Sequence, residues 1–556
     1  MDSAFKYRIA FLGCPSNFHI RWNRANLQKL RDLGFNCAQL SIAWGARPGD
    51  EPLNLEDVVD VRGTPAENGQ GLPLRSGQRP DEIRKRRENL RKRIARCKEV
   101  GLRTLFHFGA PYNMHARFGD SPPNCLSDPR VIGLYVALLE AFAGQFPGVD
   151  DLQLYTYDQD AWLCSEFGLC PRCLGVPLHE RVSAFVNRLA ETWQRLNPDG
   201  RLWWEPWELS AGQVFRSIGS LNPSCVGLAL HSNIAEVMAT MPVDRWLKNT
   251  VAMAKEAGLP VVVEHFLGGP TEEVEPFQYL TWPLVTWRGL RSIAALDVDG
   301  IKEYYGTVPT REDANLSMTS LFFADPGLSE EAALRRLAAP YGKCADDMIL
   351  FWRACSEAME LFPWESSWFI RQIGRCDPVH RMSAAFIRGQ QAHTPSWEST
   401  RRAIFMKTDS SQPDPWLLED VQLRCNLAAE RMERAVGLGK RLVASLAPAM
   451  AGDMKKQVAD LSGWRKRALS YVYHIRETNL TLILRRELEA GRAMPERLVS
   501  ELKSVLTADM ENQGAEESCR SALRLFENDP RAFVQRYFAE AGPDQLSKGM
   551  FTLTSR

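Results

Sequence analysis

Short apolar runs alternate with longer amphipathic runs along the first 306 residues of the chain. Eight of the apolar runs have the length and composition of β-strands. They are Tyr7–Leu12, Cys37–Ala43, Arg103–Phe108, Leu152–Asp158, Arg201–Glu205, Cys225–Leu230, Leu259–Glu264 and Gly300–Tyr304. The main helical patterns between them are Trp22–Leu33, Asp81–Val100, Pro129–Gln145, His179–Leu196, Asp244–Ala257 and Trp282–Ala295. Apolar strands separated by helices are typical of a parallel sheet that is covered on both faces.

Eight strand–helix units in about 300 residues favour a closed (β/α)8 barrel. An open doubly wound sheet is the alternative, but its glycine-rich signature is missing after the first strand, where Leu12–Ser16 reads LGCPS. From about Ser329 onward, long helical patterns replace the strands. We therefore predict an α/β fold, a TIM (β/α)8 barrel over residues 1–325, followed by a large all-α C-terminal domain over residues 326–556.

Composition and charge exclude several classes of partner. Lys and Arg together number 68 and so do Asp and Glu, so the net charge is zero and no basic surface for nucleic acid is indicated. With 45% hydrophobic and 24% charged residues, the chain has a globular composition. The longest apolar stretch, Val131–Phe146, contains Glu140 and is too short to span a bilayer, so we expect no membrane association. The N-terminus has no signal-peptide pattern, which favours a cytoplasmic protein, although a secreted chain without its leader would show the same pattern.

Polar and aromatic residues gather where the predicted strands end, which is the catalytic side of such barrels. They are His107 after the third strand, Asp158 and Asp160 at the fourth, Glu205 at the fifth, His231 at the sixth, Glu264 and His265 at the seventh, and Glu303 and Tyr304 at the eighth. A single carboxylate in this position is often only a helix cap or half of an ion pair. Acids at four of the eight strand ends are harder to explain in that way.

Paired carboxylates are what the cleavage of a glycosidic bond requires. We assign Asp158 as the acid/base, because the nearby Asp160 would raise the pKa of one of the two carboxyls. Glu264 is the second carboxylate, and Glu205 competes for either role. Aromatic and polar side chains near the strand ends would bind the sugar. Those assigned here are Trp44, His107, Asp160, Trp162, Trp204, His231, His265, Glu303 and Tyr304.

Several stretches resemble a diverse group of exo-acting barrel glycoside hydrolases related to the α-glucuronidases and the hexosaminidases. The run YTYDQDAWLCSEFGLCPRC resembles their fourth-strand loop, and EHFLGGP, EVEPFQYLTWPLVTWRGLRSI and DVDGIKEYYG resemble their seventh-strand to eighth-strand region. The run LRRLAAPYGKCADDMILFWRACSEAMELFP resembles the helical domain that follows such barrels. The resemblance covers roughly residues 7–365 and implies an exo-acting glycosidase with Asp158 and Glu264 as its acids. The sequence departs from the hexosaminidase Asp-Glu pair, because Asp158-Gln159-Asp160 stands there, which puts a substrate-assisted mechanism in doubt.

Two other functions stay open at this point. Histidines at three strand ends, His107, His231 and His265, could hold a metal with a carboxylate and support a metal-assisted lyase or hydrolase acting on carbohydrate. A catalytically silent carbohydrate-binding barrel is the third hypothesis. The glycosidase hypothesis requires no cofactor for catalysis, and its partner is an oligosaccharide or glycoside. The helical domain could close the mouth of the barrel or form a homodimer interface.

The cysteines suggest a separate site. Most of the 13 are scattered, but Cys164, Cys170 and Cys173 follow the fourth strand, with Cys125 and His179 as candidates for a fourth ligand. One CxxC pair with a third thiol could bind a structural zinc ion that stiffens this loop. A disulfide and free thiols are the alternatives.

Overall fold

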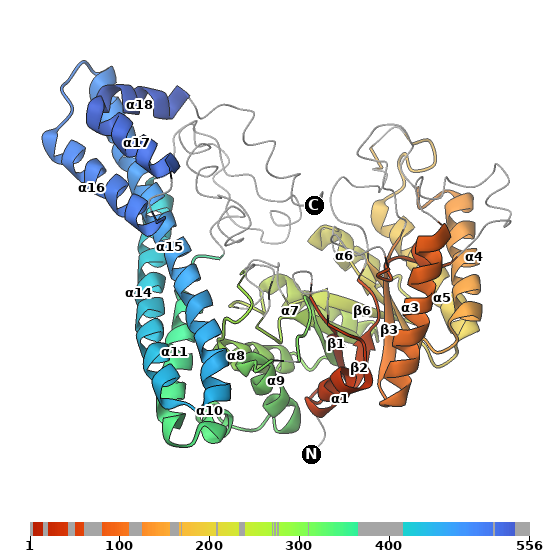
Figure 1. Ribbon diagram of the computed structural model, residues 1–556. Coiled ribbons are helices and arrows are strands. Elements are labelled where there is room, and N and C mark those ends of the chain that lie inside the picture. Colours follow the sequence, from red (N-terminus) through yellow and green to blue (C-terminus); the bar gives the residue numbers. More distant parts are fainter. Residues whose placement is uncertain are drawn as a thin grey trace.

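The structure is a computed structural model, and eight parallel strands form a closed barrel at its centre (Figure 1). It describes residues 4–14, 20–42, 50–59, 80–110, 125–155, 166–167, 170–206, 209–232, 240–269, 271, 274, 277–309, 311–364, 415–514 and 517–539. The strands are β1 (Tyr7–Phe11), β2 (Cys37–Gln39), β3 (Arg103–Gly109), β4 (Asp151–Tyr155), β5 (Leu202–Glu205), β6 (Val226–His231), β7 (Val261–His265) and β8 (Gly300–Glu303). Each strand pairs with the next in chain order, so the predicted (β/α)8 barrel is confirmed.

Helices surround the barrel because each strand is followed by a chain segment that returns along the outside. They are α1 (Arg24–Asp32), α2 (Leu55–Val58), α3 (Pro80–Glu99), α4 (Pro129–Gln145), α5 (Leu178–Leu196), α6 (Ala211–Ile218), α7 (Arg245–Glu256), α8 (Pro283–Ala294) and α9 (Ala314–Ala324). Several start at capping side chains: Asp244 accepts the Leu247 N–H at 2.7 Å, and Ser210 forms a capping box with Gln213. The short α6 was not among the predicted helices.

The barrel closes where β8 returns to β1. Tyr7 pairs with Gly300 and Ile9 with Lys302, and Leu12 forms a further bridge with Thr307. Gly306, with φ of 139°, lies so close to Gly13 that a Cβ would meet the Gly13 carbonyl oxygen. This close backbone approach requires a residue without a side chain.

Apolar side chains fill the part of the barrel interior that lies toward the amino ends of the strands. Ile9, Cys37, Leu105, Trp203, Ala229 and Val262 form one buried cluster, with Tyr7 packed against it. Trp203 has room because Gly227 faces it, where a Cβ would lie 2.4 Å from the indole ring. Residues two positions further along each strand point to the same side, so the strands place their next inward residues directly above this cluster.

The C-terminal part of the described chain is helical, as predicted. It comprises α10 (Glu330–Ala338), the 3-10 helix η4 (Ala339–Cys344), α11 (Ala345–Leu361), α14 (Pro415–Ser445), α15 (Pro448–Glu489), α16 (Glu496–Asn512), α17 (Glu517–Asn528) and α18 (Pro530–Ala539). The helix α11 packs against α8, α14 packs against α11, and α15 packs against α14, and these helices rise along one side of the barrel (Figure 1). One continuous core joins barrel residues to Met348, Trp352 and Trp464 of these helices. The division at residue 325 stays a prediction.

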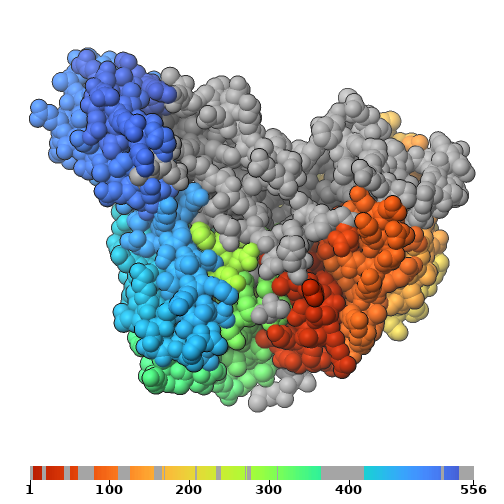
Figure 2. Space-filling model, in the orientation of Figure 1, coloured from red at the N-terminus to blue at the C-terminus, as the bar shows by residue number. Residues whose placement is uncertain are grey.

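The last helices form a lobe of their own, coloured blue in Figure 2. The end of α15 packs with α16, α17 and α18 around a separate cluster that contains Leu484, Leu502, Phe526 and Phe533. Among the helices that the structure describes, none combines the length and the apolarity needed to cross a membrane.

A carboxylate of α15 joins the helical part to the segment between β7 and α8. The Oδ2 atom of Asp460 accepts the backbone N–H groups of Gln278 at 2.8 Å and Tyr279 at 2.7 Å. Next to it, Gly463 allows the Phe277 ring to approach so closely that a Cβ would lie 2.5 Å from it. The long helix thus holds the end of the segment that joins β7 to α8.

We predict that Asp460→Ala destabilises this junction by about 3 kcal/mol, because it removes two hydrogen bonds to a charged group, each worth at least about 1.5 kcal/mol. The measurement is the midpoint of urea unfolding. The matched control is Asp453→Ala on the same helix, which removes only an ion pair to Lys456 at 3.3 Å and should cost less than about 1 kcal/mol. Equal midpoints for the two variants would contradict the role of Asp460.

Candidate active site

Polar side chains form a layer inside the barrel, directly above the apolar cluster. Seven strands each contribute one residue to it. These residues are Gln39 (β2), His107 (β3), Gln153 (β4), Glu205 (β5), His231 (β6), Glu264 (β7) and Lys302 (β8), and all of them are buried. We call this set the polar layer. It lies at or near the carboxyl ends of the strands, where barrels of this kind place their chemistry.

Glu205 is hydrogen-bonded through both of its carboxylate oxygens. Its Oε2 lies 3.0 Å from His107 Nε2 and 2.5 Å from Gln153 Nε2, and its Oε1 lies 3.0 Å from His231 Nε2. Burial alone raises the pKa of Glu205, but the hydrogen bonds from the two histidines outweigh burial and hold the pKa well below its usual range. Glu205 is therefore ionised, and an ionised carboxylate needs the Nε2 atom of both histidines to carry a proton.

Glu264 is held through one oxygen only. Its Oε1 accepts Gln153 Nε2 at 2.6 Å and Lys302 Nζ at 2.7 Å. Its Oε2 lies 3.2 Å from His231 Nε2, but has no hydrogen-bond partner among the described residues. This arrangement fixes the carboxylate in place and leaves one oxygen able to act on another group.

Gln153 and His231 link the two carboxylates. The Gln153 amide donates to both, and His231 Nε2 is within ion-pair distance of both. Together with that nitrogen, one oxygen of Glu205 and one of Glu264 lie within 4.8 Å of one another. Two carboxylates can lie so close only because Lys302 and the amide and imidazole donors offset the negative charge.

Aromatic rings lie against two members of the polar layer. The Tyr304 ring meets His231 edge-on with centroids 4.9 Å apart, and the Tyr155 ring meets His107 at 5.6 Å. Tyr155 follows Gln153 by two residues on β4, so it faces the same side of the strand. The structure therefore brings together five of the predicted residues: Glu205, Glu264, His107, His231 and Tyr304.

Three other predicted residues face away from the interior, toward the surrounding helices. Trp204 packs in the main core and not in the interior cluster that holds Trp203. His265 bonds Ser232 Oγ through Nδ1 at 3.0 Å and lies against Gly289 of α8. In a strand, neighbouring residues point to opposite faces, so Trp203 and Glu264 point inward and Trp204 and His265 do not. We correct the sugar-binding assignment of Trp204 and His265 accordingly.

Glu303 is the third of these outward residues, and it connects two loops. Its oxygens accept the N–H groups of Leu267 at 2.7 Å and Gly268 after β7, and those of Tyr305 at 2.8 Å and Gly306 after β8. Burial raises the pKa of Glu303 to about 8, against the opposing effect of these amides. This geometry supports a structural role in place of the predicted contact with substrate.

Four of the predicted residues lie outside the described residues: Trp44, Asp158, Asp160 and Trp162. Their assignments stay predictions. Sequence reasoning also missed Gln39, Gln153 and Lys302 of the polar layer. Polar residues in the middle of otherwise apolar strands were the available signal, because such residues are buried only where partners exist.

Three cysteine thiols meet, and they are those of Cys125, Cys170 and Cys173. Sγ of Cys125 lies 3.1 Å from that of Cys173 and 3.8 Å from that of Cys170. Cys164 lies outside the described residues, and His179 lies in the first turn of α5 without belonging to the cluster. Cys125, expected only as a fourth ligand, is thus one of the three that meet.

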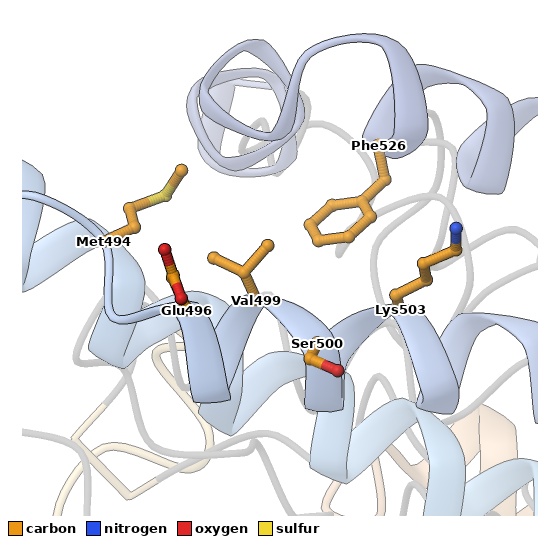
Figure 3. A pocket seen from close by; sticks show the side chains of 6 residues that line it. All are labelled: Met494, Glu496, Val499, Ser500, Lys503 and Phe526. Carbon is orange, nitrogen blue, oxygen red and sulfur yellow. The ribbon is translucent and has the colours of Figure 1, made fainter.

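Three surface cavities lined by described residues lie away from the polar layer. One of about 380 Å³ lies beside α16 and α17 in the C-terminal lobe and is lined by Met494, Glu496, Val499, Ser500, Lys503 and Phe526 (Figure 3). Others of about 270 and 560 Å³ lie against α9 and α3. None of these three cavities is lined by a residue of the polar layer.

Comparison with known proteins identifies the fold. No protein-family model matches the sequence, and no similar curated protein was found. The solved structure of a GH138 enzyme targeting pectin rhamnogalacturonan II matches with a TM-score of 0.61 at 12% identity, over 92% of this chain and 63% of that one. This chain therefore spans less than two thirds of the GH138 enzyme. The likeness shows a shared fold, a TIM barrel followed by helices.

Two further matches are weaker. A Thermobaculum terrenum O-GlcNAc hydrolase gives a TM-score of 0.42 at 10% identity, over 98% of both chains. A GH5-4 endoglucanase from an uncultured bacterium gives 0.35 at 11% identity, over 55% of this chain and 84% of that one.

We predict that Gln153→Leu destabilises the protein by about 3–5 kcal/mol, because it removes the amide that both buried carboxylates share. The urea midpoint measures the loss. Gln194→Leu, which removes an exposed side-chain hydrogen bond to the Ser224 carbonyl, is the matched control and should shift the midpoint much less. A Gln153→Leu protein as stable as that control would show that the carboxylates do not depend on the amide.

Stability should also depend on His265 below neutral pH. Burial lowers the pKa of His265 to about 3, from an ordinary 6.5. Between these values the unfolded chain binds a proton that the folded protein does not, so stability falls as pH falls. We predict that, between about pH 6 and 4, the wild type loses about 1.4 kcal/mol per pH unit more than His265→Asn. Unfolding at a series of pH values tests this, and parallel pH profiles would contradict it.

Proposed function

We propose that the protein is an exo-acting glycoside hydrolase in which Glu264 is the carboxylate that attacks the anomeric carbon or activates water. The observation that carries this proposal is the asymmetry of Glu264. Lys302 and Gln153 fix Oε1, whereas Oε2 has no hydrogen-bond partner among the described residues. A nucleophile or base needs such an available oxygen on a fixed side chain.

Glu205 is assigned a positioning role. A general acid must carry a proton, but Glu205 accepts hydrogen bonds at both oxygens and is ionised. Its charge instead orients His107, Gln153 and His231, and Gln153 in turn orients Glu264. By the sequence and the resemblance, Asp158 remains the candidate for the acid/base, three residues beyond the end of β4.

In this proposal, exo action rests on the resemblance of the sequence to exo-acting barrel glycoside hydrolases. Glu205 and Glu264 are only 1% and 0% exposed, above an interior filled by Trp203 and its apolar neighbours. The proposed substrate is a terminal sugar of an oligosaccharide or glycoside.

A metal-assisted hydrolase is the second candidate, favoured by the ligand atoms of Glu205, His231 and Glu264 within 4.8 Å of one another. The ammonium of Lys302, 2.7 Å from Glu264, opposes it by supplying positive charge where a cation would sit. This candidate would be favoured if the wild type holds one bound metal ion per chain that Glu264→Gln lacks, and if removing that ion abolishes turnover of the wild type.

We predict hydrolysis of at least one glycoside in a panel followed by proton NMR. The panel contains aryl glucuronides, galacturonides, N-acetylhexosaminides and hexosides, and pectic oligosaccharides because of what the GH138 enzyme targets. The first product from an oligosaccharide should be a monosaccharide, and its first anomer identifies retention or inversion. Internal fragments as first products would contradict exo action. A panel in which no glycoside is cleaved would contradict the assignment as a glycosidase.

Variants then assign the roles. Glu264→Gln and Asp158→Asn should each lose at least about a hundredfold in kcat, the low end for a positioned acid or base. Asp158→Asn should regain most of its rate on a dinitrophenyl glycoside, whose leaving group needs no acid, whereas Glu264→Gln should not. If Glu205→Gln shows that recovery and Asp158→Asn does not, Glu205 is the acid. Asp453→Ala is the control for a distant carboxylate.

A further inference from the structure

Three cysteine thiols meet outside the polar layer, where two loops at the same end of the barrel come together. Cys125 lies in the segment between β3 and α4, and Cys170 and Cys173 lie between β4 and α5. Cys125 and Cys173 are buried, and the three form a small cluster of their own, separate from the main core. The other described cysteines are not part of this cluster.

The backbone holds Cys170 and Cys173 together in a tight turn. The N–H groups of Cys173 and Leu174 both donate to the Cys170 carbonyl, at 3.1 and 3.0 Å. The two thiols of this CxxC pair therefore belong to one short hydrogen-bonded segment, and the Cys125 thiol approaches it from the other loop.

The sulfur positions suit a tetrahedral metal. Four sulfurs at about 2.3 Å from zinc lie about 3.8 Å from one another. The sulfurs of Cys125 and Cys170 are 3.8 Å apart, those of Cys125 and Cys173 are closer at 3.1 Å, and all three lie within 4.8 Å of one another. A disulfide would need about 2.05 Å, shorter than the 3.1 Å between Cys125 and Cys173, and would leave the third thiol without a function.

The ligand type selects the metal. All three atoms are sulfurs, and soft thiolates favour zinc over magnesium or calcium, which prefer oxygen. We propose that Cys125, Cys170 and Cys173 bind a structural zinc ion that ties the β3–α4 loop to the β4–α5 loop. The described residues supply three of the four ligands usual in such a site. Binding displaces the thiol protons, so each cysteine coordinates as a thiolate.

The metal connects two segments that come from neighbouring strands of the barrel. β3 carries His107 and β4 carries Gln153 of the polar layer, so the ion holds the loops that follow both of these strands. The inference does not depend on the proposed hydrolase activity, because its test measures metal and not turnover.

The experiment is metal analysis of the full-length protein, purified under reducing conditions, reconstituted with zinc and then dialysed. We expect one zinc per chain in the wild type and at least a tenfold lower content in Cys125→Ser, Cys170→Ser and Cys173→Ser. Cys225→Ser, which removes a buried cysteine immediately before β6, is the matched control and should keep its zinc. Glu264→Gln should keep it as well, which separates this site from a metal in the polar layer.

A second measurement covers variants that fail to fold. Wild-type protein loaded with cobalt in place of zinc should show the near-ultraviolet charge-transfer absorption of thiolate-bound cobalt, and zinc should abolish it. The proposal is overturned if the reconstituted wild type holds less than a tenth of an equivalent of zinc or if cobalt gives no thiolate band. It is also overturned if Cys225→Ser loses as much zinc as Cys170→Ser, or if peptide mapping finds Cys125 linked to Cys173.

Discussion

The compensation of two buried negative charges is the constraint on which the centre of this barrel depends. Glu205 and Glu264 are out of contact with water, where an unpaired carboxylate would cost several kcal/mol. The structure offsets them with the ammonium of Lys302, the amide of Gln153 and the imidazoles of His107 and His231. The carboxylates and their partners come from six consecutive strands, β3 to β8, so the charge balance is complete only when the barrel has closed.

The same pairing gives the two carboxylates different properties. Glu205 uses both oxygens in hydrogen bonds and serves to hold its neighbours in place, whereas one oxygen of Glu264 has no hydrogen-bond partner among the described residues.

Around this centre, a second set of contacts holds the loops that leave the strands. Glu303 accepts hydrogen bonds from the backbone of the loops after β7 and β8. Asp460 of α15 accepts the backbone N–H groups of residues 278 and 279 from outside the barrel. The helical part is therefore connected to the segment that follows Glu264, which the sequence did not indicate.

The architecture could be predicted from the sequence because parallel strands covered on both faces are apolar throughout, and all eight were located. The candidate site was predicted less well, because proximity to a strand end does not say which face a side chain occupies. Glu264 and His265 are adjacent, yet one enters the interior and the other contacts α8. Trp203 and Trp204 divide in the same way. Counting alternate positions back from one inward residue would have separated them and would also have included Gln153 and Lys302.

The order of apolar and amphipathic runs, a local property, by itself determined a (β/α)8 barrel with helices after it, and it placed acids and histidines at the carboxyl ends of the strands. Only the tertiary structure decided which of them meet. It joined Glu205 to Glu264 through Gln153, and it placed Glu303 where the carboxylate hydrogen-bonds the two loops after β7 and β8. It also brought Cys125 to Cys170 and Cys173, which are 45 and 48 residues away along the chain. The reason is physical: strand direction and register set the inward face of every strand at once, and these are fixed only when β8 pairs with β1.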